Sequence, residues 1–115
     1  MAKVEDDLVR AAVRGFSRSI ILWLVSQKPT SGYRVVKEIK RLTGQSVHPG
    51  VVYPLLYELE KEEFIVGDWV QRGRRRIKYY SITEKGTELL DRLRELFVMP
   101  VRNVLKDLLG EISGK

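Results

Sequence analysis

Residues 64–83 read FIVGDWVQRGRRRIKYYSIT, and this stretch decides the fold. Its two ends, Phe64 to Val70 and Ile77 to Ile82, are rich in β-branched and aromatic residues, as strands are. The segment between them contains a glycine and four arginines, and it has the composition of a turn. The sequence therefore predicts a β-hairpin whose tip carries a cluster of cations.

That cluster accounts for most of the net charge of the chain. The chain has 115 residues and a formal net charge of +6, and the 16 cations and 15 anions outside the cluster nearly cancel. A solvated surface normally mixes both signs, so an acid-free cationic stretch favours a polyanionic partner over ordinary solubility charge. The cluster comprises Arg72, Arg74, Arg75, Arg76 and Lys78.

The residues before the hairpin predict three helices. Apolar residues recur every four positions from Val4 to Phe16 and continue as a dense run to Val25, with Trp23 expected in the core. Gly15 and Ser17 could divide this segment into two helices. Arg10, Arg14 and Arg18 would share one helical face. We interpret this face as exposed to solvent rather than as a surface that binds phosphates.

A second helix and a third follow a turn at residues 28–32. Ser31 can cap the second helix, which ends by Gly44. The third helix is predicted to start near Gly50 or Val51, where Pro54 is compatible with its first turn. Its apolar stripe consists of Val52, Leu55, Leu56 and Leu59.

After the hairpin, Thr83 is expected to cap one long helix from Glu84 to Leu109. At 1.5 Å per residue this helix would extend roughly 39 Å, with a kink or short break at Pro100. Part of its apolar stripe would have nothing in its own chain to pack against, so a second copy of the chain is expected to cover it. The candidate dimerisation residues are Leu89, Leu93, Leu96, Phe97, Val101, Val104, Leu105 and Leu108.

The predicted fold class is mainly α with a small β-hairpin, a winged helix-turn-helix followed by a long C-terminal dimerisation helix. We expect an N-terminal helical extension over residues 1–16, a DNA-binding domain over 17–83 and the dimerisation helix over 84–115. In this unit the helix after the turn enters the major groove, while the hairpin (the wing) reaches the DNA backbone or the minor groove.

Several spaced motifs resemble the PadR family of transcriptional regulators. They are Leu22-Trp23-Leu24 with Pro29 and Gly32-Tyr33, then Gly50-Val51-Val52-Tyr53-Pro54, and then Leu59-Glu60, Ile65 and residues 76–86, which read RIKYYSITEKG. The resemblance implies a dimeric winged-helix regulator, usually a repressor, of the compact type with one terminal helix. Glu63 departs from the pattern, because the family commonly has glycine there.

The candidate DNA-binding residues at the start of the third helix are Ser46, His48, Gly50, Val51 and Tyr53. His48 and Ser46 would meet DNA or cap the helix, and Gly50 would allow close approach of the backbone. Two roles stay open for Tyr53, as packing support for the turn or as a hydroxyl donor to a phosphate. Tyr80 is expected in the core, and Trp69 is interpreted as packing, with a small-ligand pocket as the alternative.

Composition excludes several other classes of protein. The chain has no cysteine and one histidine, so we expect neither a disulfide nor a metal site, and no cofactor motif is present. Glu58, Glu60, Glu62 and Glu63 are interpreted as a solvated helix face rather than as acid–base catalysts, so no enzyme is expected. The longest apolar run is six residues, which is too short to cross a membrane, and a cytoplasmic location is expected. The single asparagine and dense Lys, Arg and Glu are typical of a thermophilic source, and we expect an archaeal one.

The predicted function is a sequence-specific double-stranded DNA-binding regulator that acts as a homodimer. One alternative is a non-specific architectural DNA-binding protein, which the same basic wing would serve. A second alternative is a winged helix that binds another protein. The identity of any small-molecule effector stays open.

Overall fold

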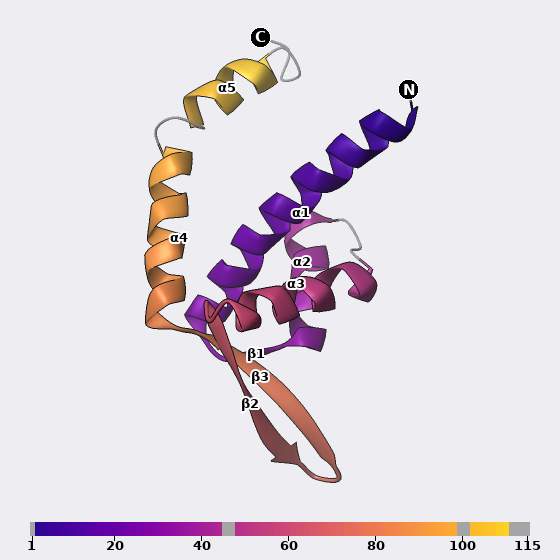
Figure 1. Cartoon of the computed structure of the whole chain (residues 1–115), viewed down its shortest axis with the longest axis vertical. Helices are drawn as coiled ribbons and strands as arrows, with labels where there is room; N and C mark the ends of the chain where they lie inside the picture. The colour runs from indigo at the N-terminus through magenta and orange to yellow at the C-terminus, as the bar shows by residue number, and fades with distance from the viewer. Residues whose placement is uncertain (1, 45–47, 99–101, 111–115) are drawn as a thin grey trace.

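The computed structural model describes residues 2–44, 48–98 and 102–110. Within these ranges the chain forms α1 (Ala2–Gln27), β1 (Thr30–Ser31), α2 (Gly32–Thr43), α3 (Pro49–Lys61), β2 (Ile65–Arg72), β3 (Arg75–Ile82), α4 (Glu84–Leu96) and α5 (Arg102–Gly110). The fold is mainly helical with a small antiparallel sheet, as expected for a winged helix. In Figure 1 the hairpin of β2 and β3 projects from one end of the helical body, and α5 lies toward the other end.

The core lies where α1, α2 and α3 meet the base of the sheet. Leu22 and Val25 of α1, Ile39 of α2 and Leu56 of α3 are each at most 2% exposed. All four side chains of the stripe predicted for the third helix are buried, which confirms its periodicity. Tyr80 is buried as predicted, because its parity along β3 places it on the same face as the core residues of the hairpin.

The predicted helix caps are confirmed at both polar N-terminal positions. The Ser31 Oγ accepts the N–H of Arg34 at 3.1 Å at the start of α2. The Thr83 Oγ1 accepts the N–H of Gly86 at 3.0 Å at the start of α4. Each cap satisfies a backbone donor that has no acceptor inside its helix. These caps fix where the helices begin relative to the sheet.

Several predictions about element boundaries need correction. α1 is one continuous helix through Gly15 and Ser17, and Ser17 is itself buried. The sheet has three strands, because Thr30 and Ser31, predicted as a turn, pair with Tyr80 and Tyr79 of β3. This pairing adds β1 at the edge of β3, beyond what the hairpin pattern alone indicated.

The prediction of one long C-terminal helix is wrong. α4 ends at Leu96 and the separate helix α5 begins at Arg102. The kink or short break expected at Pro100 concerns a residue outside the described ones. Its physical reason is that a proline inside a helix removes a backbone donor and restricts the residue before it. The last helix, α5, has nine residues, so a long C-terminal dimerisation helix is not present among the described residues.

Two tryptophans predicted to pack lie at the surface. Trp23 is 38% exposed on α1, although its neighbours Leu22 and Leu24 are buried, because it falls on the opposite side of the helix. Trp69 is 57% exposed on β2. Both predictions followed from residue type and from the apolar neighbours, which do not determine which side of an element a residue occupies.

Candidate nucleic-acid interface

The N-terminal end of α3 is organised by His48. Its Nδ1 accepts the N–H of Gly50 at 2.9 Å, and its carbonyl oxygen accepts the N–H of Val51 at 2.8 Å. Pro49 occupies the first turn, where a missing N–H costs no intrahelical bond. The helix therefore begins at Pro49, slightly earlier than predicted, and His48 is its cap. Ser46 lies outside the described residues.

The capping contact also determines how His48 faces solvent. Because Nδ1 accepts a hydrogen bond, the neutral imidazole carries its proton on Nε2. His48 is exposed, so this N–H can donate to a ligand. Gly50 and Tyr53 are also exposed, whereas Val51 is half-buried and packs against the core. Among the described residues predicted at this helix start, Val51 therefore faces inward, whereas His48, Gly50 and Tyr53 are exposed.

Tyr53 has a structural contact and an exposed side. Its ring lies against Gly32 at the start of α2, where an added Cβ would approach the ring carbon Cε1 to 2.6 Å. The side chain is still 46% exposed. Packing support and a ligand-facing hydroxyl are therefore compatible in one residue.

A groove of about 790 Å³ separates this end of the helices from the wing. Its walls are aromatic and cationic, a composition that suits a polyanion bearing flat rings or sugars. Tyr33 of α2, which the sequence analysis did not select, lies on its wall. The lining residues are Ser31, Gly32, Tyr33, Tyr53, Trp69, Arg75, Arg76, Ile77, Lys78 and Tyr80.

The wing turns at Gly73 and Arg74, with Arg72 paired to Arg75 across the hairpin. Gly73 has a φ of +62°, the left-handed conformation that a two-residue hairpin turn with glycine first requires. The strands extend further than predicted, so Arg72, Arg75 and Arg76 belong to strands. All four arginines of the wing are exposed.

The five cations of the wing have different surroundings. The Arg72 guanidinium lies 5.7 Å from the ring centre of Tyr79 on one face of the hairpin. The Arg76 guanidinium lies 5.0 Å from the ring centre of Trp69 on the other face. Lys78 differs from both, because its Nζ donates to Glu60 Oε1 of α3 at 2.8 Å.

The glutamates of α3 are not simply a solvated face. Glu58 accepts two hydrogen bonds from Arg18 of α1, and Glu60 pairs with Lys78. The hydrogen bond with Glu60 raises the pKa of Lys78, against the opposing effect of burial. Among the described residues, no group of three or more His, Asp or Glu side chains is arranged to hold a metal ion.

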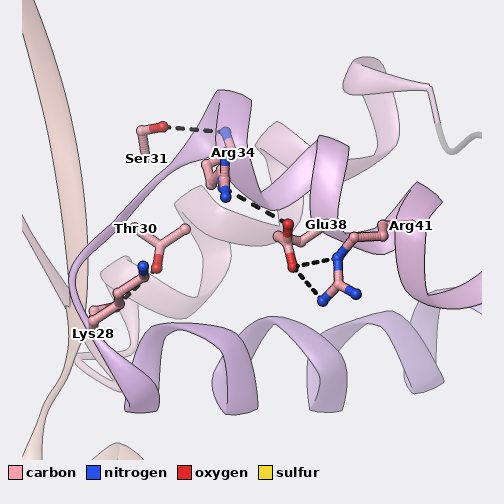
Figure 2. A network of polar contacts seen from close by, with 6 residues as sticks. All are labelled: Lys28, Thr30, Ser31, Arg34, Glu38 and Arg41. Carbon is pink, nitrogen blue, oxygen red and sulfur yellow. Dashed lines mark hydrogen bonds and ion pairs between the residues drawn. The ribbon is translucent and has the colours of Figure 1, made fainter.

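Helix α2 adds a second cationic surface that the sequence analysis missed. Glu38 lies between two arginines, with Arg41 NH2 at 2.8 Å and Arg34 Nε at 3.7 Å (Figure 2). The hydrogen bond from Arg41 lowers the pKa of Glu38. The signal was present in the sequence as four cations and one acid within α2, namely Arg34, Lys37, Lys40 and Arg41 with Glu38.

The candidate dimerisation residues divide into two sets. Leu89 and Leu93 are half-buried against the core of their own chain, and Phe97 makes an edge-to-face contact with Phe16 of α1 at 6.4 Å. The remaining described members are exposed, and Val101 lies outside the described residues. The exposed members are Leu96, Val104, Leu105 and Leu108.

No helix within the described ranges is long and apolar enough to cross a membrane.

Comparisons with known proteins match this architecture. The model of the PadR-like transcriptional regulator family matches residues 21–92. Transcriptional regulator YqjI of Escherichia coli K12 is 32% identical over 83 residues, which cover 70% of this chain but only 39% of YqjI. This chain therefore corresponds to well under half of that relative.

Several solved structures share the fold. A PadR-like transcriptional regulator from Bacillus cereus ATCC 14579 is 31% identical, with a TM-score of 0.75 over 84% of this chain and 94% of its own. Bacillus subtilis PadR, solved in complex with operator DNA, is 28% identical, with a TM-score of 0.62 over 66% of this chain and 45% of its own. Since the family model matches well over half of the sequence, the chain belongs to the PadR-like family of transcriptional regulators.

Proposed function

We propose that this chain is a sequence-specific double-stranded DNA-binding regulator that acts as a homodimer. The N-terminal end of α3 would enter the major groove, and the wing arginines would contact the backbone or the minor groove. The observation that carries the proposal is the groove between α3 and the wing, which has exposed arginines on one side and the α2 and α3 N-terminal ends on the other. Repression is the mode of regulation that the family resemblance implies.

Electrostatics supports a DNA partner in particular. Arginine side chains that contact phosphates release counterions, and arginine placed in a narrow minor groove gains from its enhanced negative potential. In helix-turn-helix proteins the first helix crosses the DNA backbone, and the basic helix α2 would take this position. The operator complex of Bacillus subtilis PadR, a structural neighbour, is consistent with the same class of partner.

His48 is the residue we select for base recognition. Its Nε2–H can donate to an acceptor on a base edge while Nδ1 continues to cap the helix. The substitution His48→Asn tests this role, because asparagine retains a capping oxygen but changes the donor that faces the DNA. The matched variant His48→Ala removes both the cap and the donor.

The test is a binding selection from a random duplex library, followed by titration on the selected site and on a scrambled duplex. A specific regulator should bind its own site at least ~10³-fold more tightly than the scrambled duplex. His48→Asn should change the preferred base at one position per half-site and cost roughly 1 to 3 kcal/mol there. Equal affinity for all duplexes would instead indicate an architectural DNA-binding protein, and no retardation at low salt would indicate a protein-binding winged helix.

A further inference from the structure

Glu60 and Lys78 connect the recognition helix to the wing. Glu60 lies in the last turns of α3 and Lys78 lies in the middle of β3, and their charged atoms are 2.8 Å apart. The two side chains are only 29% and 25% exposed, so solvent screens this pair less than a typical surface pair. A direct link of this kind fixes the distance between the two elements that are proposed to contact DNA.

The backbone of β2 leaves room for this contact. Gly67 lies on the same face of the hairpin as Lys78, and an added Cβ there would overlap the Lys78 Cε. The same Cβ would come within 3.2 Å of Glu60 Oε2. The absence of a side chain at Gly67 therefore allows the lysine stem to cross β2 and reach α3.

Aromatic rings complete the surroundings of the ammonium group. The Lys78 Nζ lies 5.2 Å from the ring centre of Tyr80 and 5.8 Å from that of Trp69. A carboxylate and two ring faces therefore stabilise the ammonium inside the protein. Arg76 differs, because a guanidinium over the Trp69 ring keeps N–H groups that can still donate to a phosphate.

We propose that Glu60 and Lys78 form a positioning pair that fixes the wing relative to α3 and keeps Lys78 away from the DNA phosphates. In this arrangement the wing contacts DNA through its arginines, although Lys78 belongs to the same cationic stretch of sequence. The inference rests on the proposed function, because the role of the pair is to orient two DNA-contacting elements.

The salt dependence of binding separates a positioning lysine from a phosphate contact. Each phosphate contact contributes about 0.9 to the slope of log affinity against log salt concentration. Lys78→Met should therefore leave this slope unchanged on a non-specific duplex, while the ratio of specific to non-specific affinity falls by about fivefold or more. Lys78→Arg, which retains the cation, should restore most of that ratio.

Glu60→Gln gives the opposite readout on the same assay. It releases the ammonium from its carboxylate and removes an anion near the DNA, so the slope on a non-specific duplex should increase by up to about 0.9. The specificity ratio should fall, as it does for Lys78→Met. A residue that only stabilised the fold would not increase the slope when its partner is neutralised. If Lys78→Met fails to fold, Glu60→Gln still provides this test.

A double-mutant cycle on the free protein tests the pair without DNA. The effects of Glu60→Gln and Lys78→Met on the free energy of unfolding should be non-additive, as measured by urea denaturation. Additive effects would overturn the proposal. If the wild-type chain binds DNA, a salt slope that is lower by about 0.9 in Lys78→Met than in the wild type would also overturn it. If the wild-type chain retards no duplex at low salt, the proposed function fails and the positioning role fails with it, although the coupling itself would still be measured.

Discussion

Arg18 of α1 and Glu58 of α3 form a two-point ion pair, in which Nε lies 2.8 Å from Oε2 and NH2 lies 3.0 Å from Oε1. Parallel hydrogen bonds of this kind fix the relative orientation of two groups as well as their distance. The pair joins α1 to α3, the helix that is proposed to enter the major groove. Hydrogen bonding from Arg18 lowers the pKa of Glu58 below its ordinary value of 4.5, and burial opposes this effect.

The first prediction is that this pair contributes stability that depends on pH. Because the pKa of Glu58 is lower in the folded chain than in the unfolded chain, its contribution is present above about pH 4.5 and is lost as the pH falls through the lowered value. The pair is partly exposed, so Glu58→Gln should lower the free energy of unfolding at pH 7 by only about 0.2 to 1 kcal/mol.

Urea denaturation of Glu58→Gln and of the wild type at pH 7 and pH 3 measures this difference. The two proteins should differ at pH 7, and the difference should be smaller at pH 3 because Glu58 of the wild type is then more protonated. Glu88→Gln, which neutralises an exposed carboxylate of α4, is the control and should follow the wild type at both values. A deficit of Glu58→Gln that persists unchanged at pH 3 would mean that its cause is packing rather than charge.

The second prediction concerns Glu63, where the chain passes from α3 to β2. Its φ is +65°, in the left-handed region that costs an L-residue roughly 1 to 2 kcal/mol. Its N–H and carbonyl oxygen are both used, by Glu60 and Thr83, and glycine would keep both bonds. Glycine relieves this strain but also increases the conformational entropy of the unfolded chain, which opposes the gain. On balance, Glu63→Gly should increase the free energy of unfolding by about 0.5 to 1 kcal/mol.

The neighbouring residue provides a matched control for Glu63→Gly. Glu62 has a φ of −84°, which any residue adopts, so Glu62→Gly gains nothing from relieved strain. It should destabilise the chain by about 0.5 to 1 kcal/mol through the unfolded state. Equal effects of the two substitutions in thermal or urea denaturation would show that the backbone at Glu63 carries no strain.

The third prediction concerns the wing arginines. Replacing Arg74, Arg75 and Arg76 with alanine should weaken binding to every duplex, because phosphate contacts carry no sequence information. Each lost contact should reduce the log–log salt slope by about 0.9. Arg92→Ala, at an exposed position of α4, should leave the slope unchanged. An unchanged slope in the triple variant, measured by salt titration, would mean that the wing tip does not contact DNA.

These features show how far the sequence determines the structure. Periodicity identified the stripe of α3, and the polar residues Ser31 and Thr83 identified two helix starts, because both signals depend on local geometry. The pairing of Thr30 with Tyr80 was not predicted, because it joins residues fifty positions apart. Long-range ion pairs were missed for the same reason, since Glu58 and Glu60 resemble any exposed glutamates until their partners are placed.

The neighbours of each wing cation could not be predicted from the sequence either. The sequence identified a cluster of five cations, yet Lys78 is bound to Glu60 whereas the Arg76 guanidinium lies over the Trp69 ring. Strand parity places these side chains on one face, but only the packing of the wing against α3 determines which cation meets a carboxylate. The candidate site was therefore predicted as a region, while the separate roles of its members required the structure.

The fourth prediction is that the chain is a dimer, because its two ends present apolar faces that its own fold does not cover. Val4 and Leu8 of α1 are 62% and 67% exposed, and Val104 and Leu108 of α5 are each 65% exposed. Apolar surface gathered on helices in this way marks an interaction site rather than a solvated surface. A second copy of the chain can cover both faces through a two-fold axis.

Sedimentation of the intact chain at micromolar concentration should therefore give a dimer. Leu105→Glu with Leu108→Glu should give a monomer, because two charges on the apolar face of α5 would have to be buried without partners. Asn103→Glu, on the polar side of the same helix, is the control and should stay dimeric. The monomeric variant should keep its fold, since no α5 residue among those described is buried.

The affinity of this monomeric variant for a two-fold DNA site should fall steeply, because the second half-site is no longer tethered to the first. An intact chain that sediments as a monomer, or a monomeric variant that keeps full affinity for a two-fold site, would contradict this prediction.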